Sequence, residues 1–438
     1  MRIHFLTFLT IAAIGAPLRG DDWPQFRGPR GDGIAQGSGL PLTWSDGNNV
    51  VWQTEIPGRG WSSPIVLGDR IWLTTAESLA LPTKDRDKRL ADLPYFPRDL
   101  TADASVTVYA LELDAASGKL LRQIELFTVD DPPVIHANNS YASPTPIADQ
   151  RRLYCHFGSL GTCAVDLASG KVVWHERHSV DEITGGGGSP VLWGHLLVFA
   201  CDGADEQFVV ALDKVTGKVV WKTPRPPIEA ADSKLRRAFS TPLIFTHDGR
   251  EQLVLPGAQW ACSYDPASGK ELWRVNIGDG HALVPRPVYQ DGIVYVCTGF
   301  MKPQLWAIRT GGSGDVSDTH VAWTWDKQVP EISSPLVTGG EIYFVSSMGV
   351  VTCLDASTGD ELWQHRVGGN FAASPLLVDG KLYFTNQVGI TTVLAPGRQY
   401  RELARNELFG QTMASLAVFD GGLLIRTSSH LYCVRGRP

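Results

Sequence analysis

Charged residues are scarce in this sequence, and neither sign dominates strongly. Asp, Glu, Lys and Arg make up 19% of the 438 residues, and the formal net charge is −7, whereas an average soluble domain is about one quarter charged. Broad nucleic-acid binding requires a basic surface, so we expect no nucleic-acid partner. Hydrophobic residues make up 43% of the chain, which is enough for a large core and excludes disorder over the whole length.

Long apolar runs are absent after the first residues of the chain. The one apolar run near the start, Phe5–Ala16, follows Arg2 and precedes Gly20. It is too short for a permanent bilayer anchor and is typical of a secretory signal, although a buried N-terminal helix is the alternative. We expect residues 1–20 to be a signal peptide and residues 21–438 to form a single exported domain, periplasmic or extracellular. The first cysteine is Cys155, so we expect neither a lipid anchor nor an integral membrane protein.

Paired cysteine motifs are absent as well. The chain has seven cysteines, an odd number, with no Cys-x-x-Cys, and the closest pair is Cys155 and Cys163. A zinc cluster is therefore not expected, and no metal site is assigned. The cysteines lie in apolar, aromatic-rich runs, where they act as small hydrophobic residues. A cross-strand disulfide between Cys155 and Cys163 is the alternative that export would permit.

A short proline motif recurs along the chain and divides it into units. The spacing is 80 residues for the first unit and 40 to 52 residues afterwards. The motif stands at Ser63-Pro64, Ser143-Pro144, Ser189-Pro190, Thr241-Pro242, Arg286-Pro287, Ser334-Pro335, Ser374-Pro375 and, without proline, Ser415-Leu416. β-Branched and aromatic runs of about five residues follow each motif, as expected for strands, and proline at the first residue of a strand costs no ladder hydrogen bond.

Five of the units also contain a turn of the form Asp-x-x-x-Gly, as in Asp213–Gly217 and Asp355–Gly359. Aspartate accepts hydrogen bonds from amides two residues on, and glycine supplies the left-handed conformation that ends the turn. Tryptophan follows four of the five glycines by four residues, and Arg122 takes this place in the first unit. The recurrence indicates that Trp174, Trp221, Trp273 and Trp363 pack between neighbouring units.

Units of this length with four short strands predict a β-propeller, because each unit then forms one blade. The last unit ends at Leu431–Val434 without a tryptophan strand, whereas an isolated strand, Val50–Thr54, stands near the N-terminus. Trp52 precedes Pro64 by the same 12 residues that separate Trp363 from Pro375. We therefore predict an all-β, eight-bladed propeller of four-stranded antiparallel blades, closed by the N-terminal strand in the last blade.

These units resemble a known family. Residues 213–221 (DKVTGKVVW) and 355–363 (DASTGDELW) are similar to the tryptophan-docking repeat of pyrroloquinoline-quinone-type propellers, which include quinoprotein alcohol dehydrogenases and the assembly lipoprotein BamB. The similarity covers residues 40–435. The opening DWPQFRGP, residues 22–29, resembles the start of exported propellers of planctomycete-like bacteria. The resemblance implies the propeller fold and leaves several functions open, because one fold hosts unrelated activities.

The predicted blades place their variable loops on one face. The Asp-x-x-x-Gly turns fall on the opposite face, so ligands are expected on the loop face. Its longest segment is an insert, residues 77–105. Within it, residues 83–90 carry charges of both signs and are predicted as a solvated loop or short helix, with a lid over the axis as the alternative. Asp202–Glu206 is predicted as an acidic hairpin loop, with a calcium site as the alternative. Gly185–Gly188 is expected to allow close packing near the axis.

The family resemblance makes a quinone-dependent dehydrogenase a hypothesis to test on the residues. That chemistry uses an aspartate base and a calcium ion held by oxygen ligands beside the quinone. Here no two cysteines are adjacent, and the residues that enter the innermost strands include no carboxylate. We therefore expect no catalytic residue, quinone or calcium. A dehydrogenase acting on alcohols or sugars, with pyrroloquinoline quinone and Ca²⁺, is the alternative function.

We predict a binding module instead: a monomeric scaffold that holds a protein or small-molecule ligand on the loop face. Service in envelope assembly is one version of this function. Arg286 is the single charged residue among those entering the inner strands, which suggests an anchor for an acidic group. An internal pair with an aspartate is the alternative for Arg286. Ligand stacking would require a tryptophan outside the repeat, such as Trp61 or Trp260. The candidate binding residues are Arg286, His136, Asn139, Tyr141, Asn370 and Trp61, and the structural tryptophans are Trp52, Trp174, Trp221, Trp273 and Trp363.

Overall fold

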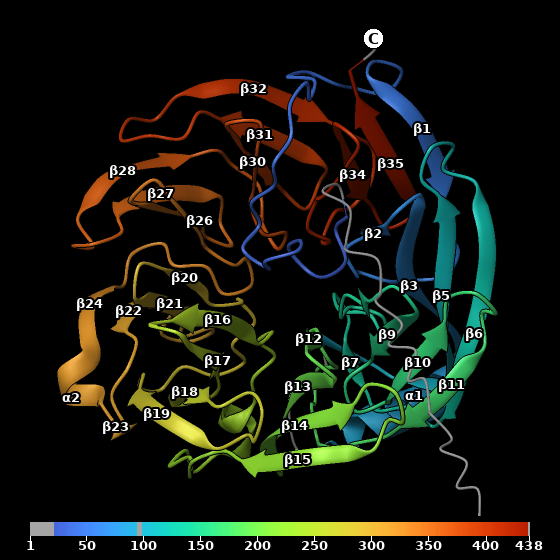
Figure 1. The fold of residues 1–438 in the computed structure, drawn as a ribbon. Helices are drawn as coiled ribbons and strands as arrows, with labels where there is room; N and C mark the ends of the chain where they lie inside the picture. The colour runs from blue at the N-terminus through green and yellow to red at the C-terminus, as the bar shows by residue number, and fades with distance from the viewer. Residues whose placement is uncertain (1–21, 94–98, 437–438) are drawn as a thin grey trace, which may run out of the picture.

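The chain forms a ring of eight β-sheets around a central axis, which confirms the predicted eight-bladed propeller (Figure 1). The computed structural model describes residues 22–93 and 99–436. The expected signal peptide, residues 1–20, and residues 94–98 of the insert lie outside the described part. Seven of the eight described blade sheets have four strands, and the sheet of blade 4 has a fifth short strand.

The strands of each blade run from the axis outwards in chain order. Blades 1 and 2 contain β2 (Ile65–Leu67), β3 (Arg70–Ala80), β5 (Asp103–Asp114), β6 (Leu120–Asp130), and β8 (Ile147–Ala148), β9 (Arg152–His156), β10 (Thr162–Asp166), β11 (Val172–Glu176). Blades 3 and 4 contain β12 (Val191–Trp193), β13 (Leu196–Asp202), β14 (Gln207–Asp213), β15 (Val219–Pro224), and β16 (Leu243–His247), β17 (Arg250–Pro256), β18 (Trp260–Tyr264), β19 (Glu271–Asn276), with β23 (Gly314–Asp315) added.

The second half of the ring repeats this order. Blades 5 and 6 contain β20 (Val288–Gln290), β21 (Ile293–Cys297), β22 (Leu305–Arg309), β24 (Val321–Trp325), and β25 (Leu336–Thr338), β26 (Glu341–Val345), β27 (Val350–Asp355), β28 (Glu361–Arg366). Blade 7 contains β29 (Leu376–Val378), β30 (Lys381–Thr385), β31 (Ile390–Leu394) and β32 (Glu402–Glu407). Blade 8 contains β33 (Ala417–Phe419), β34 (Gly422–Arg426), β35 (His430–Arg435) and the N-terminal β1 (Val50–Glu55).

Pairing of the two ends of the chain closes the ring. Strand β1 lies antiparallel to β35, with Trp52 opposite Cys433 and Gln53 opposite Tyr432. This register is the predicted one, because it gives Trp52 the outer-strand position that Trp363 holds beside Cys353 in blade 6. Closure leaves no blade without its fourth strand among the described residues, so no sheet edge is exposed at the seam.

The tryptophans join each blade to the turn of the next. The ring N–H groups of Trp52, Trp174 and Trp221 donate to the carbonyl of the residue after the turn aspartate, as from Trp52 to Ala115 (3.1 Å) and from Trp174 to Lys214 (3.1 Å). Arg122 replaces tryptophan by donating from Nη2 to the same carbonyl position, Leu167, at 2.6 Å. Trp363 donates to the Gly397 carbonyl of blade 7 at 3.0 Å. Contacts of this kind therefore hold the outer strands together around most of the ring.

Two blades depart from the predicted tryptophan pattern. Trp273 donates to Gln252 in its own blade at 2.8 Å, because β23 covers it. Strand β23 belongs to a long connection in blade 5 that replaces the Asp-x-x-x-Gly turn and includes α2 (Ser317–His320). Trp323, which the sequence pattern missed for this reason, bonds Ala356 of blade 6 at 3.1 Å.

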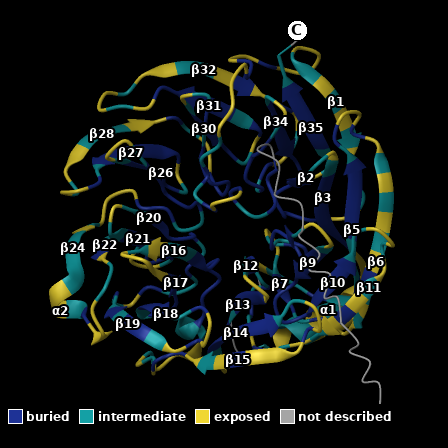
Figure 2. Ribbon diagram, in the orientation of Figure 1, coloured by how far each residue is buried: buried dark blue, intermediate teal, exposed yellow. Residues whose placement is uncertain are grey.

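The core lies between the blades and around the inner strands. Figure 2 shows buried residues along the strands nearest the axis and exposed residues along the outermost strands. The seven cysteines are all buried free thiols, as favoured for small apolar residues in sheets. Cys155 and Cys163 lie opposite each other in β9 and β10 but form no disulfide.

The insert in blade 1 extends the blade beyond its neighbours. Strands β3 and β5 extend as a two-stranded ribbon. Helix α1 (Thr83–Ala91) follows β3 in the chain and has no buried residue. Arg89 holds the helix to the connection after blade 1 through Asp131 (2.6 Å) and the Pro132 carbonyl (2.6 Å). Figure 1 shows α1 near the rim of the ring rather than over its middle, so the short-helix prediction fits better than a lid.

The closure predicts a clear difference between two neighbouring substitutions in β1. Trp52→Ala should lower the free energy of unfolding by roughly 2–4 kcal/mol, because a half-buried ring and its bond to blade 1 are lost. Val51→Ala, at a side chain that is 51% exposed, should cost below about 1 kcal/mol. Urea unfolding of both variants measures this, and equal midpoints would contradict the role of β1.

Candidate functional site

A ring of hydrogen bonds surrounds the axis where the chain enters the inner strands. The backbone N–H of seven of the eight entry residues donates to the side-chain hydroxyl of the neighbour in the next blade, at 2.9–3.0 Å. The residues are Ser63, Thr145, Ser189, Thr241, Arg286, Ser334, Ser374 and Ser415. The hydroxyls are thereby structural, as the sequence pattern suggested.

The second blade corrects the sequence alignment of the motif. Thr145-Pro146 leads into β8 and Thr145 takes part in the ring, whereas the predicted Ser143-Pro144 does not lead directly into the strand. Ser143 instead donates to Asn139 in the connection before it, at 2.6 Å. Two proline motifs stand in succession here, and the sequence alone gave no reason to prefer the second.

Arg286 interrupts the ring, because its side chain has no hydroxyl to accept the bond from Thr241. Its guanidinium is buried, and Nη1 donates to the carbonyl of Phe26 at 2.8 Å. No aspartate forms an ion pair with it in the described part of the chain. Its burial means that a protein partner cannot reach the guanidinium directly, so the predicted anchoring role is restricted to a small ligand.

The N-terminal segment, residues 22–36, fills the axis beside this arginine. It pairs with inner strands on different sides of the ring: Trp23 with Val66 of blade 1, Pro24 with Ala148 of blade 2, and Gly33 with Leu377 of blade 7. Figure 1 shows this blue segment crossing the middle of the ring. Gly28 is required here, because its φ is +82° and a Cβ would lie 2.6 Å from the Trp23 ring.

Buried positive charge makes the axis unsuitable for a cation. Arg27, Arg286 and Arg426 are each 2–3% exposed. Burial lowers the pKa of Arg426 to about 9, so its guanidinium remains charged at neutral pH. Among the described residues, no group of three His, Cys, Asp or Glu side chains could hold a metal ion. The donors at the axis therefore do not fit the calcium ion that quinoprotein chemistry uses.

Four of the predicted binding residues lie together on the loop face, at the connection between blades 1 and 2. His136 is in β7 (Ile135–His136), which pairs with β4 (Leu100–Thr101) of the insert. Asn139 donates to the Thr184 carbonyl, and Tyr141 donates to the Pro133 carbonyl at 2.9 Å. Trp61 is buried and donates to the Asn138 carbonyl at 3.0 Å. These side chains mainly shape the connection.

A cleft of about 410 Å³ opens beside this connection. Its charged lining consists of Arg59, Glu77 and Asp103, and Tyr141 forms part of its wall. Burial raises the pKa of Asp103, against the opposing effect of a hydrogen bond from Ser78 and the charges of Arg59 and Arg89. Arg59 and Asp103, which the sequence pattern did not single out, give the cleft charges of both signs.

The remaining predicted residues lie apart from this cleft. Asn370 is in the connection between blades 6 and 7, where its carbonyl accepts from Gln387 at 2.7 Å. Arg286 is in blade 5, so the contacts do not bring the six residues into one pocket. Trp260 is fixed by a bond to the Pro227 carbonyl (2.9 Å) and by the Arg274 guanidinium, 5.2 Å from its ring centre. The binding roles of all these residues stay predictions.

The acidic loop after β13 has an internal partner. Both carboxylate oxygens of Asp202 accept from Arg225, at 3.0 and 2.6 Å, and both side chains are buried. Asp205 accepts from the Asp181 amide at 2.7 Å. The prediction of a bare acidic loop is therefore wrong for Asp202, because Arg225 from the end of the outer strand folds back on it.

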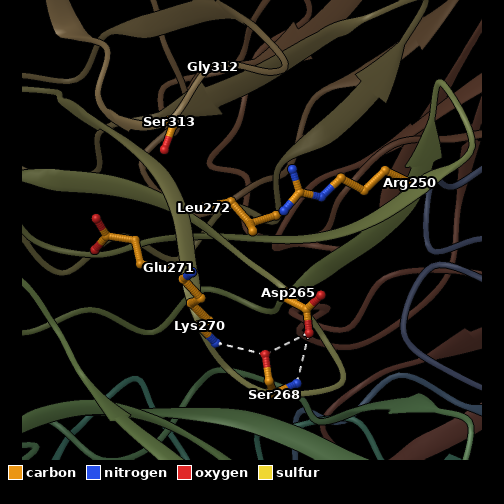
Figure 3. Close-up of a pocket in the computed structure, with 8 residues that line it drawn as sticks. All are labelled: Arg250, Asp265, Ser268, Lys270, Glu271, Leu272, Gly312 and Ser313. Carbon is orange, nitrogen blue, oxygen red and sulfur yellow. Dashed lines mark hydrogen bonds between the residues drawn. The ribbon is translucent and has the colours of Figure 1, made fainter.

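A smaller hollow of about 160 Å³ lies on the turn face between blades 4 and 5 (Figure 3). Asp265 in its wall accepts from the amide and hydroxyl of Ser268, at 2.9 and 2.8 Å. These are the bonds that hold the Asp-x-x-x-Gly turn, and Gly312 and Ser313 come from the long connection of blade 5. The hollow follows from the changed turn and offers no separate chemistry.

Three consecutive blades each carry an exposed apolar side chain in a loop of the loop face. Met301, Met348 and Val388 stand in the loops between the second and third strands of blades 5, 6 and 7 and are 71%, 64% and 62% exposed. Phe409, in the next connection, is 74% exposed. We call these four residues the apolar tips. In the sequence, two of these tips are marked by an apolar residue immediately before a glycine, at Gly349 and at Gly389.

The chain matches the family model of outer membrane protein assembly factor BamB over residues 34–206, 86–259 and 257–434. Among solved structures it is similar to BamB from Moraxella catarrhalis, at 13% identity and a TM-score of 0.54, covering 88% of this chain and 99% of that one. It is also similar to a europium-containing methanol dehydrogenase, at 11% identity and a TM-score of 0.50, covering 94% and 91%. These likenesses support the fold alone.

Two curated relatives match parts of the chain. Tetrathionate hydrolase of Acidithiobacillus ferrooxidans is 23% identical over 339 residues, which is 74% of this chain and 62% of the hydrolase. Serine/threonine-protein kinase AfsK of Streptomyces griseus is 31% identical over 160 residues, or 34% of this chain and 17% of the kinase. The match thus spans less than two thirds of either relative. Among the described residues, no helix has the length and apolar character needed to cross a membrane.

Glu182, in the connection between blades 2 and 3, predicts a pH dependence of stability. Burial raises the pKa of its carboxyl to about 7, despite bonds from the Ser159 amide (3.1 Å) and hydroxyl (3.0 Å). The unfolded chain has a lower pKa, so the folded protein should lose stability as the pH rises from about 4.5 to 7.

Glu182→Gln removes this titration. At pH 8 the variant should be more stable than the wild type by roughly 1–3 kcal/mol, the lower values reflecting the partial exposure of the side chain. At pH 4.5 the two should be equal. Thermal unfolding across this range tests the effect, with the exposed Glu229→Gln as control; a constant difference at all pH values would refute it.

Proposed function

Because the chain belongs to the family of outer membrane protein assembly factor BamB, we propose that it is an exported, non-catalytic scaffold that binds another protein during cell-envelope assembly. The apolar run at residues 5–16 supports export, and the family supports a protein partner. The binding surface is the loop face, where blades 5 to 7 present the apolar tips. The partner is therefore expected to offer a complementary apolar surface.

The apolar tips are the observation that carries this proposal. A side chain such as Phe409, 74% exposed, gains free energy by transfer from water into a protein interface. The tips stand on loops held by the rigid ring, as the Leu408 amide is bonded to Gly389 and the Thr412 amide to Gln387. A prearranged set of apolar side chains binds with a smaller loss of conformational freedom than mobile loops do.

The cleft between blades 1 and 2 would add polar contacts at the far side of the same face. Arg59 lies 6.0 Å from the centre of the Trp61 ring, and its guanidinium also bonds the Ala137 carbonyl. Arg59 and Asp103 offer charges of both signs, which would fix the orientation of a partner segment rather than supply most of the affinity. This surface, with apolar tips and a polar cleft, resembles a protein interface in composition.

A quinone-dependent dehydrogenase is the competing function, supported by the likeness of the fold to a methanol dehydrogenase. Its cofactor would require a calcium site and a carboxylate base near the axis. The described axis offers Arg27, Arg286 and a ring of bonded hydroxyls instead, and the N-terminal segment occupies the space between the inner strands. We therefore derive no catalytic step for this chain.

Photo-crosslinking in cells of the source organism tests the protein-binding proposal. A photoreactive amino acid at Phe409 or Met348 should give discrete adducts with an envelope protein, because these side chains face the partner. Val215, 54% exposed in a turn of blade 3, is the matched control on the opposite face and should give none. Adducts of equal yield from both faces, or none from either, would count against the proposal.

Substitution of the tips gives a quantitative test with the purified partner. Combining Met348→Gln, Val388→Thr and Phe409→Ser should weaken binding tenfold or more, about 1.4 kcal/mol, without changing the unfolding midpoint. Val215→Thr should leave the affinity unchanged. Dye-linked alcohol oxidation after addition of pyrroloquinoline quinone and Ca²⁺ is measured in parallel, and activity there would favour the dehydrogenase.

A further inference from the structure

Two arginine side chains at the axis are buried, and the Asp32 carboxylate is the one negative side chain of the described residues whose charge acts on both of them. Arg27 and Arg286 are 2% and 3% exposed, and neither forms an ion pair with a carboxylate of the described residues. Arg286 donates to the carbonyl of Phe26, the residue before Arg27, and this bond places the two arginines close together. Burial lowers the pKa of Arg286, and the positive charge of Arg27 lowers it further, to about 9.

Part of each guanidinium lacks an acceptor. Arg286 donates from Nη1 to Phe26 at 2.8 Å, and Arg27 donates from Nη2 to the Asp32 carbonyl at 2.9 Å. The Nε and Nη1 groups of Arg27 and the Nε group of Arg286 are buried with no partner. Buried N–H groups of a charged side chain are strongly destabilising unless something accepts from them.

The neighbouring side chains do not supply the missing acceptor. The Asp32 carboxylate already accepts from Arg30 Nε at 2.7 Å and from the Ile34 amide at 2.9 Å. Burial raises the pKa of Cys297 far above neutrality, so its thiol stays protonated. Burial lowers the pKa of Arg27 only to about 10, so both guanidinium groups remain cationic at neutral pH.

We propose that a small monovalent anion of the size of chloride binds at the axis, against the free N–H groups of Arg27 and Arg286. The anion would balance the two like charges and accept the hydrogen bonds that the protein leaves unmade. The site is tight, because a Cβ at Gly31 would lie 2.1 Å from Arg286 Nη1. This packing favours a halide over a larger polyatomic anion.

The anion would also fasten the N-terminal segment to the ring. Arg27 belongs to that segment, whereas Arg286 replaces the hydroxyl of blade 5 in the axial ring. Binding between the two would therefore join the start of the domain to a blade remote from β1 in the ring. The inference is independent of the proposed function, since it concerns the interior of the ring and not the loop face.

Unfolding of the full chain at constant ionic strength tests the site, with chloride exchanged for gluconate, which is too large to enter. Each tenfold rise in chloride above its dissociation constant should raise the folding equilibrium constant of the wild type about tenfold. Arg286→Gln should abolish this dependence. Arg398→Gln, at an arginine of blade 7 whose side chain is 57% exposed, should retain it.

Crystals of the wild type soaked in bromide give a second measurement that does not require the variant to fold. An anomalous peak in contact with Arg27 and Arg286 is the expected result. An unfolding midpoint that is the same in chloride and gluconate, or a bromide map with no peak at these two side chains, would overturn the proposal and assign the space to water.

Discussion

Pairing between β1 and β35 is the interaction on which the whole architecture depends. The four main strands of every other blade come from one stretch of the chain, so its sheet can form locally, but blade 8 needs residues from both ends of the chain. Once Trp52 lies beside Cys433, its ring also reaches the turn of blade 1, and the first and last blades become neighbours like any other pair. The axial hydrogen-bond ring then closes as well, because the Ser415 amide can reach the Ser63 hydroxyl at 3.0 Å. Closure of the outer strands and closure of the axis are thus two consequences of one pairing.

The same closure gives the two faces of the propeller different properties. The turn face is fixed by short Asp-x-x-x-Gly turns, whose side chains are used in internal bonds. The loop face receives the longer connections and carries the apolar tips and the cleft. The axis between them is filled by the N-terminal segment and contains buried arginines instead of carboxylates. These features favour recognition at the loop face over chemistry at the axis. The BamB family and the quinone dehydrogenases share this fold, so the distinction depends on the residues.

Much of the fold could be predicted from the sequence, because the repeat imposes it locally. The strands, the turns and the position of Trp52 follow from spacings within one unit and a comparison between units. The departures came from contacts that spacing does not encode. Trp323 was missed because a longer connection replaces its turn, and the Asp202–Arg225 pair joins residues on adjacent parts of one blade only after folding. The axial position of residues 22–36 could not be predicted, since it depends on four separate blades. For the candidate site, the sequence pattern singled out the loop face and Tyr141, which lines the cleft, but neither the apolar tips nor Arg59; the binding roles stay predictions.

Hydrogen exchange of the native backbone amides tests the closed ring most directly. β1 is the edge strand of its sheet, so protection is expected only for those of its amides that donate to β35. If the ends of the chain pair as described, these amides should exchange as slowly as those of β35, and both should open only with global unfolding. Exchange in Val50–Glu55 at the rate of an exposed loop, while β35 and the other blades remain protected, would contradict the account. The ring would then be stable without pairing of β1 to β35.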